Sequence, residues 1–370
     1  MRPDVLGKKA LNRATLGRQL LLRRSDLSVL QAVEHLVGLQ AQVPSNPYIA
    51  LWSRLAEFRP ESLARLLEDR KVVRLPLMRA TIHLVSADDC LELRPLMQPV
   101  LDAELDRHSE YGPALRELDL EPVLQAARLV LAESPRTGPE LRASLADGTP
   151  GANPAALAYA CRNRLALVQV PPRGVWGRTS QVTTTTAEAW LGRPLETAPS
   201  LENAVLRYLA AFGPAATADV SAWSRLTGLR EVVERVRPEL RTFRDERGRE
   251  LFDLPDAPRP DPETPAPPRF LPEYDNLLLS HADRGRFHHD RARPSDVRGP
   301  VRGTVLSDGA VCGVWRVERE RRGEHATLVV EHVVRLTKLA KSGLEDEGRR
   351  LLCLVAADAT DHDVSFVAAG

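Results

Sequence analysis

Proline occupies seven of the fourteen positions from residue 255 to residue 268, and this run limits how the 370-residue chain can fold. Proline has no amide hydrogen and holds φ near one value, so the run can form neither a helix nor an inner strand. We therefore predict that residues 255–268 are a stiff linker between the regions 1–254 and 269–370.

One order of elements recurs before the linker: three helices, followed by a β-hairpin. It is clearest in residues 201–254, where apolar residues at helical spacing give way to two short strand patterns around a turn. The same order is repeated in residues 121–200 and, more loosely, in residues 1–120. This is the order of a winged helix, and repetition of a unit is stronger evidence than one copy. We predict three tandem winged-helix units with these bounds.

The pattern after the linker is that of strands. Apolar or alternating stretches lie at residues 270–280, 303–306 and 311–319. Residues 324–336 are expected to pair with residues 311–319 in a long hairpin across a charged turn. A helix ending near Leu354 and a final strand at residues 364–367 follow. We predict a small antiparallel β-barrel-like domain over residues 269–370, which makes the whole chain an α+β protein.

The composition is that of a soluble globular protein, with 43% apolar and 27% charged residues. No apolar stretch approaches the roughly 20 residues that span a bilayer, and the basic N-terminus lacks the apolar core of a signal peptide. Cys90, Cys161, Cys312 and Cys353 are far apart and form no metal or redox motif. We expect a cytoplasmic monomer with reduced thiols, no membrane contact, no metal and no cofactor.

Nearly all of the positive charge is arginine, which pairs bidentately with phosphate, although a GC-rich genome produces the same bias. The net charge is only +1, so a DNA-binding face would have to be segregated from an acidic one. A winged helix lays its third helix in a groove and its wing on the DNA backbone. The candidate phosphate contacts on those elements are Arg162, Arg164, Arg173, Arg178, Arg230, Arg235 and Arg237. Each of them alone is better explained as a solvated surface charge, so the prediction concerns the set.

Gln40-Ala41-Gln42 follows a predicted helix and precedes Val43-Pro44. Side chains two residues apart diverge on a helix but share a face in an extended segment, and a proline disfavours the helical region for the residue before it. The two glutamines can therefore converge on one spot. A polar helix end is the simpler alternative, because the pattern is short.

Three segments together carry a resemblance that covers nearly the whole chain. They are Gly38-Leu39-Gln40-Ala41-Gln42-Val43-Pro44, Arg79-Ala80-Thr81-Ile82-His83-Leu84, and the long segment at residues 270–284 that reads FLPEYDNLLLSHADR. In this order they resemble the AlkZ/YcaQ family of bacterial winged-helix DNA glycosylases. Gln40 and Gln42 match the catalytic motif of the AlkZ-like branch, in which two glutamines flank a hydrophobic residue. The resemblance implies tandem winged helices and a C-terminal barrel clamped on duplex DNA, removal of N7-alkylpurines, and unhooking of interstrand crosslinks.

The residue types agree with that chemistry. A primary amide is no general base, but it can hold a water molecule near C1′ and direct its dipole at a developing oxocarbenium charge. Such help suffices only for a base that leaves readily, as cationic N7-alkylguanine does. No lysine lies near these motifs, so a Schiff-base lyase is not expected. Glu34, Asp88 and Asp89 lie near in sequence and could supply a general base.

A crosslinked base is tethered to both strands and cannot be flipped into a tight pocket. The hairpin at residues 311–336 is the element that we expect to enter the groove instead. It carries Arg316, Arg319, Arg321, Arg322 and His325. An exposed, solvated loop explains the same residues equally well.

Four further residues could support the site: His83, Asp275, Asn276 and His281. The alternatives are a hydrogen-bonded core histidine, a turn and a structural network. For the whole chain, the alternative function is a non-catalytic winged-helix regulator or a protein that sequesters a DNA-binding drug, because winged helices are most often found in regulators.

Overall fold

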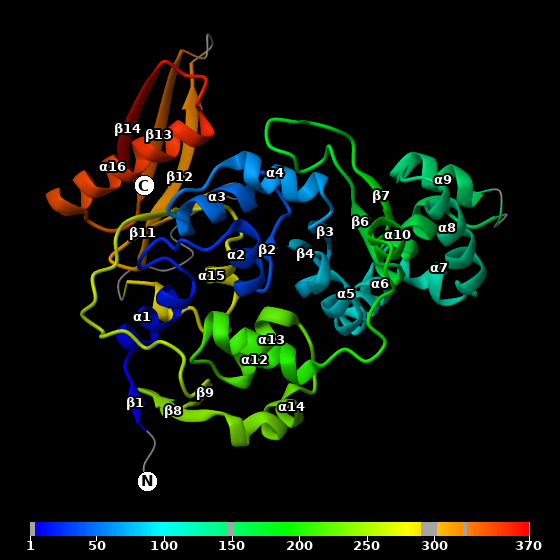
Figure 1. Ribbon diagram of the computed structural model, residues 1–370, viewed down its shortest axis with the longest axis horizontal. Coiled ribbons are helices and arrows are strands. Elements are labelled where there is room, and N and C mark those ends of the chain that lie inside the picture. Colours follow the sequence, from blue (N-terminus) through cyan, green and yellow to red (C-terminus); the bar gives the residue numbers. More distant parts are fainter. Residues whose placement is uncertain (1–3, 147, 149–150, 290–301, 321–323, 370) are drawn as a thin grey trace.

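The computed structural model describes residues 4–146, 148, 151–289, 302–320 and 324–369, with helices packed around three sheets (Figure 1). The first segment contains α1 (Lys8–Arg18), α2 (Val29–His35), β2 (Leu39–Gln40), α3 (Asn46–Arg54), α4 (Pro60–Glu68), β3 (Val72–Pro76) and β4 (Ile82–Ser86). Three helices that the sequence pattern did not indicate then follow: α5 (Ala87–Leu96), α6 (Gln98–Arg107) and α7 (Gly112–Arg116). Pro95 lies inside α5, and the other two helices carry proline in the first turn, which interrupts the apolar period.

The second segment places its helices where the sequence predicts them. It contains α8 (Glu121–Glu133), β5 (Arg136–Thr137), α9 (Gly138–Ala146), α10 (Pro154–Arg164), β6 (Leu167–Gln169), β7 (Thr183–Thr186) and α11 (Ala187–Leu191). For the hairpin of this segment, the sequence pattern also predicts a second strand at residues 175–182. The structure has a loop there instead, in which Gly174 and Gly177 have φ of 90° and 71°. The Tyr48 hydroxyl fixes this loop to the first segment, because it donates to the Gly174 carbonyl at 2.8 Å and accepts from the Trp176 amide at 3.0 Å.

One six-stranded sheet joins the first two segments, in the order β2-β4-β3-β6-β7-β5. The junction is short, since β3 and β6 meet antiparallel with Arg74 opposite Gln169. The two segments therefore share hydrogen-bonded strands as well as a chain connection.

The third segment contains α12 (Leu201–Phe212), α13 (Thr217–Ser224), α14 (Leu229–Val236), the 3-10 turn η2 (Arg237–Glu239), β8 (Arg241–Asp245) and β9 (Glu250–Asp253). The N-terminal residues complete it, because β1 (Val5–Leu6) pairs in parallel with β8. Arg18 of α1 forms two buried hydrogen bonds with the Asp253 carboxylate, at 2.6 and 2.8 Å. The chain start is thereby fixed to a segment more than 200 residues away in sequence.

Residues 255–268 contain no helix or strand, but they lie along α1 rather than crossing open solvent. The Arg13 Nε donates to the Thr264 carbonyl at 2.7 Å, and Arg18 donates to the Pro258 carbonyl at 3.3 Å. Lys9 pairs with Glu263 at 2.5 Å. Buried arginine donors thus satisfy carbonyl groups of a segment that cannot pair with itself.

The C-terminal segment is an open sheet in the order β10-β11-β12-β13-β14, so the expected barrel is wrong for the described residues. Its strands are β10 (Arg269–Leu271), β11 (Gly303–Ser307), β12 (Ala310–Arg319), β13 (His325–His332) and β14 (Asp361–Ala368). The first three pairings are antiparallel, but β14 pairs with β13 in parallel. The long helix α16 (Lys338–Val355) makes that parallel return possible, since it carries the chain back along the sheet. The segment expected to be a strand to residue 280 ends at Leu271 and continues into α15 (Asn276–Leu279) and η3 (Gly285–Phe287).

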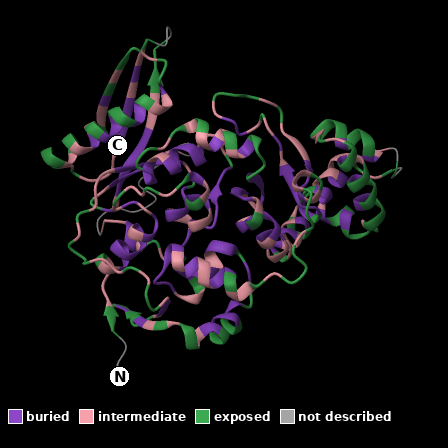
Figure 2. Cartoon of the chain, viewed as in Figure 1, coloured by how far each residue is buried: buried purple, intermediate pink, exposed green. Residues whose placement is uncertain are grey.

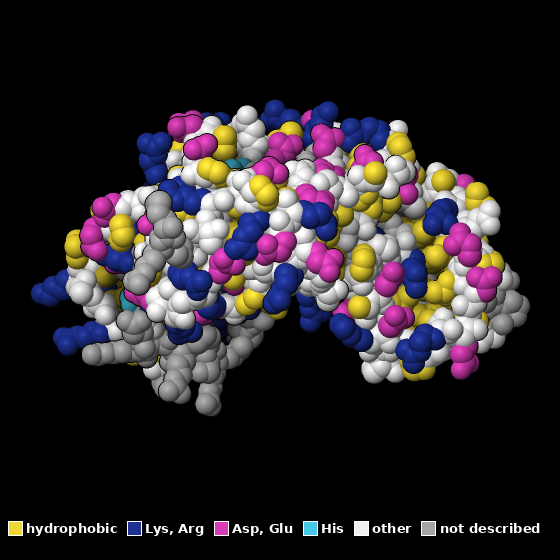
Figure 3. Space-filling model, turned by 90° about the horizontal axis from the view of Figure 1, so that it is seen from below, with side chains coloured by type: hydrophobic (Ala, Val, Ile, Leu, Met, Phe, Trp, Pro, Cys, Tyr) yellow, Lys and Arg dark blue, Asp and Glu magenta, His cyan; other side chains and the backbone are white. Residues whose placement is uncertain are grey.

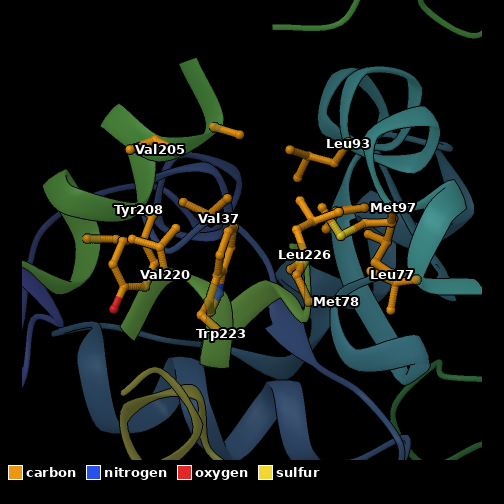
Figure 4. Close-up of a cluster of buried hydrophobic side chains, with 14 of the residues drawn as sticks. Val37, Leu77, Met78, Leu93, Met97, Val205, Tyr208, Val220, Trp223 and Leu226 are labelled. Carbon is orange, nitrogen blue, oxygen red and sulfur yellow. The ribbon is translucent and has the colours of Figure 1, made fainter. Parts of the chain in front are cut away.

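The largest core is shared by the first and third segments. Figure 4 shows Val37, Leu77 and Met78 meeting Trp223 and Leu226 of the third segment, with Leu93 of α5 and Met97, which follows α5, beside them. Burial is concentrated in these central elements, whereas the outer faces of α8 and α9 are exposed (Figure 2). Among the described residues, no helix is long and apolar enough to cross a membrane.

Candidate active site

The strand that carries Gln40 begins at a sharp turn after α2. Val37 and Gly38 have φ of 53° and 84°, and a Cβ on Gly38 would lie 2.5 Å from Val85 Cγ1. Glycine is required here because the chain needs both a left-handed conformation and a close approach to β4. The turn then delivers β2 to β4, with Leu39 opposite Leu84 and Gln40 opposite His83.

Asn276 fixes the backbone on both sides of Leu39. The backbone N–H of Gln40 donates to Asn276 Oδ1 at 3.1 Å, and Asn276 Nδ2 donates to the Gly38 carbonyl at 2.6 Å. The side chain of Asn276 therefore serves as the missing neighbouring strand for β2. Residues more than 230 positions apart in sequence meet here, and Gln40 is only 7% exposed.

Arg79 connects the Gln40 side chain to the rest of the site. Its Nη2 donates to Gln40 Oε1 at 2.7 Å and to His83 Nε2 at 3.2 Å, while Nη1 donates to the Trp223 carbonyl. Burial, then the charges of Arg284 and Arg225, lower the pKa of Arg79 to about 10, so the guanidinium remains charged at neutral pH. Arg79 belongs to a motif visible in the sequence, but its role could not be predicted, because its side-chain direction depends on a left-handed backbone, φ 59°.

Gln42 is exposed and lies just beyond the end of β2. Its Oε1 accepts the Ile82 amide at 3.3 Å, in place of the backbone carbonyl that would continue the ladder. Gln40 and Gln42 thus direct both carbonyl oxygens at one stretch, residues 79–82. Each oxygen keeps a second lone pair, and each amide keeps NH2 donors for a water molecule or a sugar.

His83 is buried, and its ring forms hydrogen bonds within the site and does not face a substrate. Its Nδ1 donates to the Thr81 carbonyl at 2.9 Å, so Nε2 is the acceptor for Arg79. Burial, followed by the Arg79 charge, lowers the pKa of His83 to about 3. The ring is neutral in any ordinary buffer, which suits a structural acceptor.

Of the remaining predicted supports, Asp275 is part of a buried ion pair and His281 lies elsewhere. The Asp275 carboxylate accepts two hydrogen bonds from Arg54, at 2.7 and 2.9 Å, and its Oδ1 also caps α15 by accepting the Leu277 amide. His281 contacts Ser280 and the Phe212 carbonyl at the end of α12. The structure therefore brings Gln40, Gln42, His83 and Asn276 together, with Asp275 behind them, but places His281 against the third segment.

The carboxylates considered as general bases are engaged with arginines. Asp89 pairs with Arg207, and Asp88 pairs with Arg193 at 2.5 Å. Glu34 lies beside both, and burial followed by the Asp89 and Asp88 charges raises its pKa. Another acidic residue, Glu273, is attached to the first segment through its backbone carbonyl, which accepts from Asn46 Nδ2 at 2.7 Å. Burial raises the pKa of its side chain. The described residues contain no cluster of three or more His, Cys, Asp or Glu able to hold a metal ion.

The predicted phosphate-binding arginines divide into two groups. Within the described part of the chain, Arg162 and Arg230 are exposed and form no ion pair or hydrogen bond with another residue. The others have acidic or carbonyl partners: Arg164 with Asp102, Arg178 with Glu68, Arg235 with Glu202, Arg237 with Glu250, and Arg173 with the Ser180 carbonyl. In the hairpin, Arg316, Arg319 and His325 pair with Glu318, Asp358 and Asp361, while Arg321 and Arg322 lie outside the described residues.

The surface of the molecule is hollowed between two lobes. Figure 3 shows the hollow opening between the lobe of α7–α10 and the remainder of the chain, with Lys and Arg side chains along its edge. A concave surface with basic side chains along its edge favours a polyanion such as a nucleic acid.

Comparison with known proteins identifies the class. The chain matches a family model described as "DNA glycosylase AlkZ-like" over residues 33–353, so it is an enzyme that acts on N-glycosyl bonds in DNA. The match covers most of its length, and the protein belongs to this AlkZ-like family of DNA glycosylases. The resemblance predicted from the three sequence segments is thereby confirmed.

No curated protein matches the sequence significantly. Among solved structures, the DNA glycosylase AlkZ of Streptomyces sahachiroi is similar, with a TM-score of 0.75 at 20% sequence identity. The similarity covers 98% of this chain and 100% of that chain. It shows that the two proteins share a fold.

Proposed function

We propose that the protein is a monofunctional DNA glycosylase that hydrolyses the N-glycosidic bond of cationic N7-alkylpurines in duplex DNA. The observation that carries this is the pair of amides of Gln40 and Gln42, both held along residues 79–82. The described hydrogen bonds of these two side chains involve no carboxylate. Catalysis by amides alone requires a base that leaves without further activation.

The reaction balances without a strong base. Water attacks C1′ of the deoxyribose as the C1′–N9 bond breaks, and the electron pair of that bond neutralises the positive charge of the departing N7-alkylguanine. Positive charge therefore moves from the base to the sugar, and the water gives its proton to solvent once bonded to C1′. The free lone pair on Gln42 Oε1 accepts from the water, and the Gln40 amide, held by Arg79, orients it.

Two features favour bulky or crosslinked lesions over small ones. Gln42 is exposed at the end of β2, so its amide does not require the base to enter an enclosed cavity. The hairpin of β12 and β13 also forms one end of the C-terminal sheet, with β14 beside it (Figure 1). We propose that the three helical segments act as tandem winged helices along the duplex, with Arg162 and Arg230 on phosphates, and that the hairpin enters a groove. The protein would act as a monomer.

The test is excision from a duplex that carries one N7-methylguanine, scored as alkaline strand cleavage at the abasic site. Wild-type protein should produce the break, and Gln40→Ala and Gln42→Ala should each lower the single-turnover rate at least about tenfold while binding the duplex normally. Gln125→Ala, on the exposed face of α8, is the matched control. Borohydride should trap no covalent complex. Intact DNA under conditions where wild-type protein binds it would contradict the proposal.

A second substrate separates the lesion classes. The same measurement on a duplex joined by an N7–N7 guanine crosslink should give unhooking at a rate within about tenfold of the monoadduct, because the exposed site needs no base flipping. Cleavage of the monoadduct alone would restrict the protein to singly alkylated bases.

A further inference from the structure

Tyr274 has an unusual combination of exposure and backbone conformation. Its side chain is 39% exposed, which makes it one of the few large apolar residues at the surface of the described chain. Its φ is 58°, in the left-handed region that costs free energy for a residue with a bulky side chain. No hydrogen bond joins its hydroxyl to another described residue. A left-handed backbone and a partly exposed aromatic ring therefore coincide at this residue.

The residues on either side of Tyr274 are held firmly. The Glu273 carbonyl accepts from Asn46 Nδ2 at 2.7 Å, and Asp275 is paired with the buried guanidinium of Arg54. Asn276 is bonded to Gly38 and Gln40. Because its neighbours on both sides are fixed, the loop sets the backbone conformation from which the Tyr274 side chain extends.

The same contacts attach the segment that contains Tyr274 to the segment that contains the candidate catalytic pair. One end of its loop is attached at Gln40 and the other at Asn46, and Gln42 lies between those two attachment points along the chain. The two segments therefore run alongside each other, with Tyr274 and Gln42 each in the interior of its own segment.

We propose that Tyr274 is a binding residue whose ring stacks on a DNA base next to the alkylated nucleotide and holds the glycosidic bond toward Gln42. This rests on the proposed function. Every base presents a π-face, so an aromatic platform recognises DNA without regard to sequence. A rigid ring also loses little conformational entropy on binding, because its orientation is set in advance. The strained backbone is the cost of presenting the ring beside the reacting bond.

The experiment uses the full chain and a duplex with one N7-methylguanine, with 2-aminopurine as the adjacent base. Tyr274→Ala should lower the single-turnover excision rate, or weaken binding, by about five- to a hundredfold, the range expected for loss of one base–aromatic stack. Tyr274→Phe keeps the ring and should stay within about threefold of wild type. Leu129→Ala, which truncates another exposed apolar side chain, on α8, is the surface control.

Tyr274→Gly separates stacking from folding. Glycine adopts a positive φ without strain, so this variant should unfold at the same or a higher temperature than wild type. It should nevertheless lose excision to the same extent as Tyr274→Ala. Excision by the Ala and Gly variants within twofold of wild type would overturn the proposal.

Fluorescence distinguishes failure of this inference from failure of the proposed function. Stacking on Tyr274 should quench the 2-aminopurine signal on binding for wild type and Phe, but not for Ala or Gly, on a 2′-fluoro duplex that resists cleavage. If wild type quenches but excises nothing from the cleavable duplex, the proposed reaction is wrong and the aromatic contact stands. If all four proteins give the same fluorescence, the contact is wrong.

Discussion

Arg79 donates to the Gln40 side-chain oxygen at 2.7 Å and, from its other terminal nitrogen, to the Trp223 carbonyl. One guanidinium therefore fixes the amide of a candidate catalytic residue and connects it to the third helical segment. The amide can present its NH2 group and one oxygen lone pair in only one orientation, since an arginine donor can meet only the oxygen. Orientation of Gln40 thus depends on how the first and third segments pack.

Replacing Arg79 should impair the reaction more than the binding of DNA. Arg79→Ala frees the Gln40 amide to rotate, and we expect the single-turnover rate to fall about 10- to 100-fold, in line with a charged hydrogen bond of roughly 1.5–3 kcal/mol. Arg79→Lys keeps the charge but not the two-armed geometry, and should recover only part of the rate. Excision and duplex affinity are measured for the same preparations, with Arg128→Ala on α8 as control. An unchanged rate in Arg79→Ala would remove Arg79 from the site.

The buried pair of Arg54 and Asp275 should be costly to break. Both side chains are at most 1% exposed, and Asp275→Ala leaves a guanidinium in the interior without its anion. We expect the free energy of unfolding to fall by about 3–5 kcal/mol in urea titrations. Glu121→Ala removes the partner of Arg128 in a surface pair, exposed 48% and 72%, and should cost at most about 1 kcal/mol. Equal losses in the two variants would contradict this account.

Acid should destabilise the fold through its buried histidines. Burial lowers the pKa of His83 from 6.5 to about 3, and it lowers the pKa of His281 as well. Between pH 6.5 and about 3 the unfolded chain binds a proton at His83 and the folded chain does not, so unfolding is favoured as the pH falls. The stabilisation is fully present above pH 6.5 and declines below it, by up to about 1.4 kcal/mol per pH unit for one histidine.

Urea unfolding at pH 7.5, 6 and 5 measures this slope. His83→Gln should lose stability less steeply with acid than wild type does, whatever its stability at neutral pH, because glutamine does not titrate. His281 retains its own contribution in that variant, so the slope is reduced and not abolished. Parallel slopes for the two proteins would show that His83 takes up its proton equally in both states.

The helices of the second and third segments could be predicted because most of them are short and have a clear start or stop. Ser200 caps α12, and Gly213 ends it. The strand order of the open C-terminal sheet could not be predicted, because a strand pattern does not identify its partner. β14 joins β13 in parallel only because α16 intervenes. The association of β1 with β8 was equally hidden, since two residues carry no readable period.

The candidate site was predictable in its motifs and not in its connections. The extended segment around Gln40 follows from Pro44, but the roles of Arg79 and Tyr274 depend on left-handed backbone angles of 59° and 58° at non-glycine residues. The identities of arginine and tyrosine do not predict such angles, because both residues usually adopt negative φ. Side chains that reach across more than 200 residues, as Asn276 does to Gln40, are likewise set by the tertiary fold alone.

The arginines that are free of partners should dominate the salt dependence of DNA binding. Arg162 on α10 and Arg230 on α14 are exposed and have no ionic partner among the described residues, so each can neutralise a phosphate without first breaking an ion pair. Replacing either by Ala should lower the slope of log Kd against log salt concentration by about 1, uniformly across duplex sequences. Arg235→Ala should change it less, because that side chain already pairs with Glu202 at 2.7 Å and the pair carries no net charge. Titrations of a fluorescent undamaged duplex between 50 and 300 mM salt compare the three variants directly. The contrary result is that Arg235→Ala lowers the slope as much as the other two variants do. That result would mean that the Arg235–Glu202 ion pair breaks when DNA binds, and that the other paired arginines can contact phosphates in the same way.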